Sequence, residues 1–183
     1  MHTTARHLLS IGGLLLATAA VPAAASAQSS TLQPVRVTAE AVSRADRLRI
    51  EAEALPTRVD QFSKAAKLLE KSAKEREPGD TATPTLLRTA AFLRYYSGDV
   101  GASTRLMEKA AQRSVEHGDV VNAATAYIDA AIIAAEDAQP SRALDLGRRA
   151  ELLASSPALT DAQRDALRGR MASWHAVEVA LNR

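Results

Sequence analysis

The sequence predicts an all-α protein built as an array of antiparallel helix pairs. The dipeptide Gly-Asp occurs at Gly79-Asp80, Gly98-Asp99 and Gly118-Asp119, at intervals of about twenty residues. Glycine suits the left-handed position just past a helix end, and aspartate suits the cap that begins the next helix. Aromatic residues make up only 3% of the chain, whereas alanine is abundant. This composition favours closely packed helices over a β-sheet.

The first 27 residues are predicted to be a cleavable signal peptide. Arg6 precedes an apolar run from Leu8 to Val21, and Ala25-Ser26-Ala27 supplies small residues before a cut at Gln28. An uncleaved anchor stays open as an alternative, although the run is shorter than the roughly 18 residues that span a bilayer. No cysteine follows the run, which excludes a lipid-anchored lipoprotein. We expect a periplasmic or secreted mature protein.

Length and charge limit the possible functions. The 183 residues are enough for one domain with a continuous core, and the absence of cysteine means that packing must stabilise it without disulfides. The formal net charge is only +2. This balance argues against binding to nucleic acid and against strong attraction to anionic surfaces.

The domain is predicted to follow a polar, flexible leader at 28–37 and to occupy 38–183. Its first helix runs from 38 to Leu55 and is stopped by Pro56. Thr57 is predicted to cap the second helix, which reaches about 76. After a loop, Thr83 is the expected cap of the third helix, with Pro84 at its first position.

The later helices follow with short connections. They are predicted at 84–97, 100–117, 119–136 and 140–155. Ala138-Gln139 stands where a fourth Gly-Asp would fall, and Ser156-Pro157 ends the last of these helices. Thr160 and Gln163 form a capping box that opens a final helix at 160–182. The predicted pairs are therefore 38–76, 84–117 and 119–155, followed by a capping helix.

Small residues recur on one face of the second helix of each pair. When the segments are overlaid at offsets of about 40 residues, small side chains stand seven positions apart in each. These pairs are Ala65 with Ser72, Ser103 with Ala110, and Ala143 with Ala150. Seven residues are two helical turns, so both small residues face the same neighbour and allow it to approach closely.

These features resemble the tetratricopeptide repeat family. The resemblance is carried by the Gly98-Asp99 turn, by the small residues above, by Ala138, and by Ala91 and Ala131, which fall where the family's first helix has its small packing residue. It implies a right-handed α-solenoid. The repeat length in this chain is nearer 38 to 40 residues, whereas the family's repeat has about 34 residues. Leu87 and Tyr127 also replace the family's typical tryptophan, and no proline closes the repeats.

No pattern in the sequence indicates catalysis, a cofactor or a metal. His117 precedes a glycine at a helix end, and His175 stands beside Trp174 in what we interpret as a partly exposed polar pair. Without cysteine or two histidines at ligand spacing, a transition-metal site is not expected. Nucleophile motifs and phosphate-binding loops are also missing.

The resemblance implies that the first helix of each pair lines a concave groove. The side chains expected there are Arg88, Phe92, Tyr95, Tyr96, Ile128, Ile132 and Glu136. Tyrosine and arginine are common at binding hot spots, but Phe92 and Tyr95 filling the core remains an alternative. We therefore expect a non-enzymatic exported scaffold that binds a protein or peptide segment. The alternative is a permanent structural or assembly subunit of an envelope complex.

Overall fold

The computed structural model describes residues 42–55 and 57–182, which form seven helices and no strand within one compact unit. The helices are α1 (Arg44–Glu53), α2 (Val59–Lys74), α3 (Thr83–Tyr96), α4 (Val100–Glu116), α5 (Val120–Glu136), α6 (Pro140–Ala154) and α7 (Asp161–Leu181). The all-α class is therefore confirmed for the described residues. The predicted signal peptide, the leader and the start of the first helix lie outside them.

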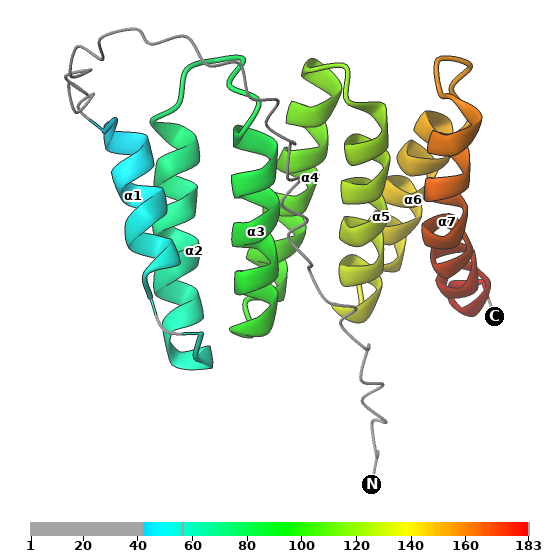
Figure 1. Cartoon of the computed structure of the whole chain (residues 1–183). Coiled ribbons are helices and arrows are strands. Elements are labelled where there is room, and N and C mark those ends of the chain that lie inside the picture. The colour runs from blue at the N-terminus through cyan, green and yellow to red at the C-terminus, as the bar shows by residue number, and fades with distance from the viewer. Residues whose placement is uncertain (1–41, 56, 183) are drawn as a thin grey trace, which may run out of the picture. The chain divides into compact units, whose positions relative to one another are not determined.

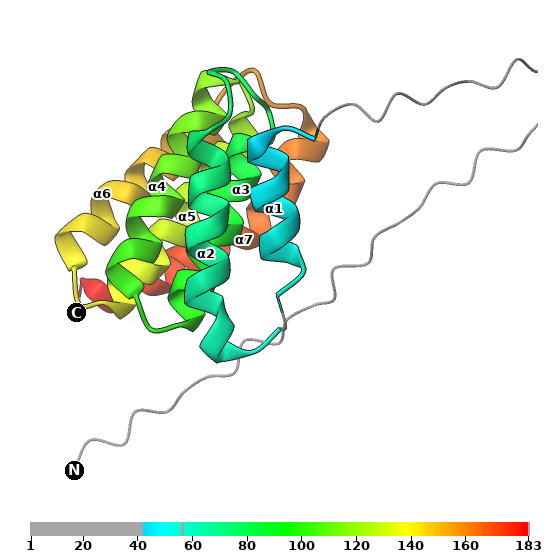
Figure 2. The same ribbon diagram turned by 90° about the vertical axis from the view of Figure 1, so that its left-hand side faces the viewer.

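Each helix packs against the next one along the chain, from α1 to α6 (Figure 1). The last helix, α7, packs against both α5 and α6. When the molecule is viewed from the α1 end, α4 and α6 lie to one side of α1 and α3, and α7 passes obliquely behind the other helices (Figure 2). Side chains of α3 and α7 meet on α5, where Arg88 and Arg170 both bind Asp129, so these three helices share a face.

The turns use the backbone chemistry that the Gly-Asp pairs predict. Gly98 and Gly118 have φ angles of 87° and 70°, in the left-handed region. Asp99 and Asp119 cap the following helices, and their carboxylates accept the backbone N–H groups of Ala102 and Asn122. The α5–α6 turn needs the same conformation, but it contains alanine there.

Ala138 adopts a φ of 53° at this fourth turn, where its side chain is strained. We expect Ala138→Gly to raise the free energy of unfolding by up to about 1 kcal/mol, because the strain exceeds the entropy that glycine adds to the unfolded chain. Gly98→Ala is the matched control and should lower it by a similar amount. A Cβ at Gly98 has no heavy atom within 4 Å, so backbone strain alone acts there. Urea unfolding midpoints measure both, and equal shifts in one direction would contradict the prediction.

Two predicted caps are corrected. Helix α2 begins after Arg58, which makes no side-chain cap, so Thr57 is not the capping residue. Helix α3 begins at Thr83 itself, with Ala82 before it and Pro84 in the first turn. The proline places the start of α3 correctly because it lacks the N–H that would be unpaired there. The capping box of Thr160 and Gln163 at α7 is confirmed.

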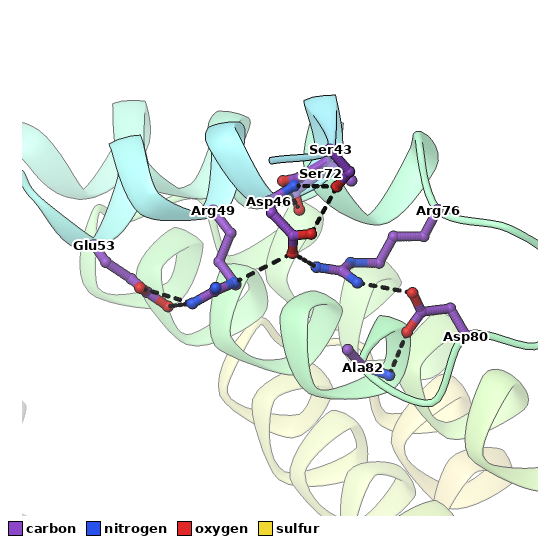
Figure 3. Close-up of polar contacts among 9 residues, drawn as sticks. Ser43, Asp46, Arg49, Glu53, Ser72, Arg76, Asp80 and Ala82 are labelled. Atoms are coloured by element: carbon purple, nitrogen blue, oxygen red, sulfur yellow. Dashed lines mark hydrogen bonds and ion pairs between the residues drawn. The ribbon is translucent and has the colours of Figure 1, made fainter. Parts of the chain in front are cut away.

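A partly buried arginine ties the first helix to the loop between α2 and α3 (Figure 3). Arg76 Nη2 donates to Asp46 Oδ1 at 2.6 Å, and Arg76 Nη1 donates to Asp80 Oδ2 at 2.7 Å. Asp80 in turn accepts the backbone N–H of Ala82 at 2.8 Å. The hydrogen bond from Ser43, followed by the one from Arg76, holds the pKa of Asp46 below its usual value. The network therefore joins α1 to the loop that leads into α3, by charge-assisted hydrogen bonds.

The core consists of small side chains between closely spaced helices. The eight residues with predicted packing roles are all buried: Ala65, Ser72, Ala91, Ser103, Ala110, Ala131, Ala143 and Ala150. The two serines also hydrogen-bond across helices. Ser72 Oγ donates to the Ala45 carbonyl at 2.7 Å, and Ser103 Oγ donates to the Ala91 carbonyl at 2.8 Å. Each serine is therefore small enough for close helix packing, and its buried hydroxyl still has a hydrogen-bond partner.

One large side chain anchors the final helix to α6. Trp174 of α7 is fully buried, and its ring lies on Gly147 of α6, where a Cβ would overlap the indole. Its Nε1 donates to Glu151 Oε1 at 3.0 Å. The interpretation of Trp174 as partly exposed is therefore wrong. The glycine on the facing helix provides room for the ring and explains its burial.

Candidate interaction site

An ion-pair ladder crosses the face formed by α3, α5 and α7. Its centre is Asp129 of α5, which is 8% exposed. Arg88 of α3 donates to Asp129 Oδ2 from Nη2 at 2.9 Å and from Nε at 3.2 Å. Arg170 of α7 donates to Asp129 Oδ1 at 2.6 Å. Each carboxylate oxygen thus serves one arginine, and the ladder links helices that are not consecutive along the chain.

The arginines of the ladder keep donors available for a ligand. The Arg88 and Arg170 side chains are 31% and 44% exposed. A guanidinium has five N–H donors, of which Asp129 uses only part. Burial raises the pKa of Asp129, and the nearby charges of Arg170 and Arg88 oppose that shift. The ladder therefore presents two anchored cations around one buried carboxylate.

Aromatic rings continue this surface toward α2. Tyr95 and Tyr96 meet edge to face with centroids 5.4 Å apart, and Tyr96 lies 6.3 Å from the ring of Phe62. The Arg88 guanidinium lies 5.6 Å from the centroid of Phe92. Aromatic and arginine side chains together are typical of binding surfaces, since they combine large area with a polar group.

Phe62 also lines a pocket of about 340 Å³ between α1, α2 and α3. The apolar part of its lining includes Leu55, Leu86 and Leu93, and Thr89 stands at its exposed edge. Helix α3 lies between this pocket and the ladder, because Thr89 faces the pocket while Arg88 faces Asp129. We call the pocket, the aromatic rings and the ladder together the α3 surface.

The structure distributes the predicted groove residues between this surface and the core. Arg88 joins the ladder, Tyr95 hydrogen-bonds to Glu136, and Tyr96 is 48% exposed. Phe92 and Ile132 are partly buried and pack against the core. The expectation for Ile128 is corrected, because this side chain is 0% exposed and cannot contact a partner in this conformation.

Asp129 and Arg170 were not among the residues predicted from the sequence. The missed signal is a constant spacing: the Arg88–Asp129, Asp129–Arg170 and Tyr95–Glu136 pairs are each separated by 41 residues. A search for opposite charges at one repeat length would have found the ladder. Asp129 lies within the otherwise apolar helix α5, so its charge there needs a partner.

The Tyr95 hydroxyl on this surface has a raised pKa, which can be measured by titration. Its hydroxyl donates to Glu136 Oε2 at 2.6 Å, which raises the pKa of Tyr95 to about 12. An unfolded tyrosine loses its proton near pH 10, at about its model-peptide pKa. The proton is held more tightly in the fold, so this contribution to stability is complete below about pH 10 and is lost as the pH rises toward 12.

We expect Tyr95→Phe to remove this alkaline titration and to lower the free energy of unfolding by about 1 kcal/mol at neutral pH. Tyrosinate absorbance measured against pH follows the titration. Tyr96→Phe is the matched control, because this neighbouring ring makes no side-chain hydrogen bond among the described residues. Retention of the pH 12 titration in Tyr95→Phe would contradict the assignment.

One group of possible metal ligands does come together. Glu151 of α6 and His175 and Glu178 of α7 have donor atoms within 4.8 Å of one another. His175 Nδ1 lies 3.4 Å from Glu178 Oε2 and 3.7 Å from Glu151 Oε1. The sequence hides this group because its members come from two helices. Glu151 Oε1 already accepts the Trp174 indole N–H at 3.0 Å, so this carboxylate has a structural role without a metal.

The comparisons with known proteins add no constraint to these observations. No protein-family model, no curated protein and no solved structure matches the chain. Among the described helices, none combines the length and the apolar character needed to cross a bilayer.

Proposed function

We propose that the chain is an exported, non-enzymatic scaffold that binds a segment of a partner protein on the α3 surface. In this proposal the helices form a tetratricopeptide-like, right-handed solenoid of antiparallel pairs. Its mature form begins near Gln28 and resides in the periplasm or outside the cell. The observation that carries the proposal is the continuity of the ladder, the aromatic rings and the apolar pocket across α3.

The chemistry of the α3 surface describes the partner segment. An apolar side chain of the partner fits the pocket beside Phe62 and Leu93. Acceptors of the segment, either backbone carbonyls or a carboxylate, reach the free donors of Arg88 and Arg170. Packed helices and paired charges hold these groups in place before binding, so little ordering is required when the partner arrives.

A blocking substitution tests the proposal. Thr89 is exposed at the pocket edge, and Thr89→Arg should fill the entrance without disturbing the core. Gln112→Arg on the exposed part of α4 is the matched control, because it adds the same charge elsewhere. Partner capture from the native envelope is compared by quantitative mass spectrometry. We expect a protein that the parent and the Gln112→Arg variant retain and that the Thr89→Arg variant loses. Equal retention by all three would contradict the proposal.

The second candidate function is a permanent subunit of an envelope complex. The fully buried attachment of α7 through Trp174 favours it, since a fixed terminal helix could present a constant flank to a neighbour. A permanent subunit co-purifies at fixed stoichiometry and resists dilution, whereas a scaffold that binds transiently does not. N-terminal sequencing of the purified chain tests export in either case, and an intact Met1 would contradict processing.

A further inference from the structure

All five lysines of the chain gather on one surface. Lys64, Lys67, Lys71 and Lys74 follow one another along α2, and Lys109 lies on α4. All five are exposed, and together they line a shallow hollow of about 560 Å³. The arginines of the domain are spread over α1, α3, α4, α6, α7 and the loops. We call this the lysine surface; α2 and α4, which carry it, can be followed in Figure 2.

The lysines have no carboxylate partners within the described part of the chain. None of them takes part in the ion pairs found among residues 42–55 and 57–182. Two nearby acids are bound by arginines instead. Glu70 lies 2.7 Å from Arg94, and Glu108 lies 3.0 Å from Arg142. Glu77, which lines a neighbouring hollow with Lys74 and Lys109, can offset part of the charge. The lysine surface therefore keeps a net positive charge.

The net charge of the whole chain conceals this concentration. A formal charge of +2 predicts little attraction to anionic surfaces, yet five positive charges lie within one hollow. Only one acid, Glu70, also lines it, and that acid is paired. Salt screens the interaction between exposed charges beyond about 10 Å. Attraction to an anionic surface therefore depends on the local cluster of lysines and not on the net charge of the whole chain.

The lining of the hollow is apolar between the lysines. Leu68 of α2 and Leu106 of α4 are partly exposed there, and Leu87 of α3 is buried beside them. A cationic rim around leucines matches a ligand that has an anionic head and an apolar body. A lysine side chain suits such a boundary, because its stem can lie on apolar atoms while its ammonium contacts the head group.

We propose that the lysine surface docks on an anionic lipid membrane. Phosphate groups of the lipids contact the five ammonium groups, and the upper part of the acyl region reaches Leu68 and Leu106. Clusters of four to eight basic residues on an amphipathic helix have this behaviour, with about 1 kcal/mol from each lysine near the surface. The α3 surface does not contribute, so this inference stands independently of the proposed partner binding.

Vesicle sedimentation tests the inference. The full chain is mixed with vesicles that contain phosphatidylglycerol and, separately, with vesicles of phosphatidylcholine alone. We expect stronger binding to phosphatidylglycerol, and an affinity that falls as salt rises. Lys64→Gln/Lys67→Gln/Lys71→Gln should weaken that binding by about 100-fold, since each lysine contributes about fivefold. All three positions are exposed, so the fold should be retained, and circular dichroism checks this.

The matched control removes the same charge elsewhere. Arg47, Arg148 and Arg168 are exposed on α1, α6 and α7, and their triple replacement by glutamine should leave vesicle binding nearly unchanged. Parent and variants share the same N-terminal residues, so a difference between them reports the substituted side chains. Equal losses in the lysine and arginine variants would overturn the inference, as would equal binding to both vesicle types. Binding of inorganic phosphate in place of vesicles would also overturn it and would assign a small anion.

Discussion

Gly147→Ala is expected to lower the free energy of unfolding by about 3 kcal/mol, at the upper end of the usual cost of overpacking. The added Cβ would overlap the fully buried ring of Trp174, and its three nearest atoms all belong to the rigid indole, which has no free end to move aside. Either the tryptophan leaves its site or α7 moves away from α6 while it stays attached to α5 through Arg170. Because the chain contains a single tryptophan, its fluorescence reports this displacement directly, and a shift toward longer wavelengths is expected.

Gly169→Ala is the control for this substitution. Gly169 lies within α7, and a Cβ there has no heavy atom within 4 Å. Alanine should therefore stabilise the helix by about 0.5–1 kcal/mol through its better helix propensity. Chemical denaturation of both variants gives two shifts of opposite sign if the contact is real. Destabilisation of the same size in both would show that Gly147 does not accommodate the ring.

Removal of both arginines of the ladder is the second large change. Arg88→Ala/Arg170→Ala leaves Asp129 buried without a cationic partner, and we expect a loss of about 3–5 kcal/mol in the free energy of unfolding at neutral pH. Urea denaturation measures it. The cause is the unpaired charge and not the loss of contact area, because both arginine side chains are partly exposed.

Two further measurements separate the charge from other causes. Addition of Asp129→Asn to the double variant should restore most of the stability, since the amide is neutral. The loss should also shrink as the pH falls, because burial already raises the pKa of Asp129 in the parent. Removal of the arginines raises the pKa of Asp129 further. The Asp129 carboxylate is then protonated at a higher pH in the folded protein than in the unfolded chain. A loss that is independent of pH and of Asp129→Asn would contradict this explanation.

The local structure of the protein could be predicted from its sequence. Helix ends depend on neighbouring residues, so Gly98-Asp99, Gly118-Asp119 and the capping box at Thr160 were located correctly. The spacing of small residues identified positions that are indeed buried, such as Ala110 and Ala150. Errors of one residue occurred at Thr57 and Thr83, where proline marks the boundary without identifying the cap.

Contacts between distant helices needed the three-dimensional structure. Trp174 beside His175 has the pattern of a surface pair, and its burial depends on the missing side chain at Gly147 of another helix. The sequence alone likewise did not show that Arg88 and Arg170 share one carboxylate, or that Ile128 faces the core. Helical periodicity orders the residues around one helix, but the angle and distance between helices decide which of them meet. The sequence therefore determined the helices and the caps of α4, α5 and α7, and the packing of the helices created the α3 surface and the lysine surface.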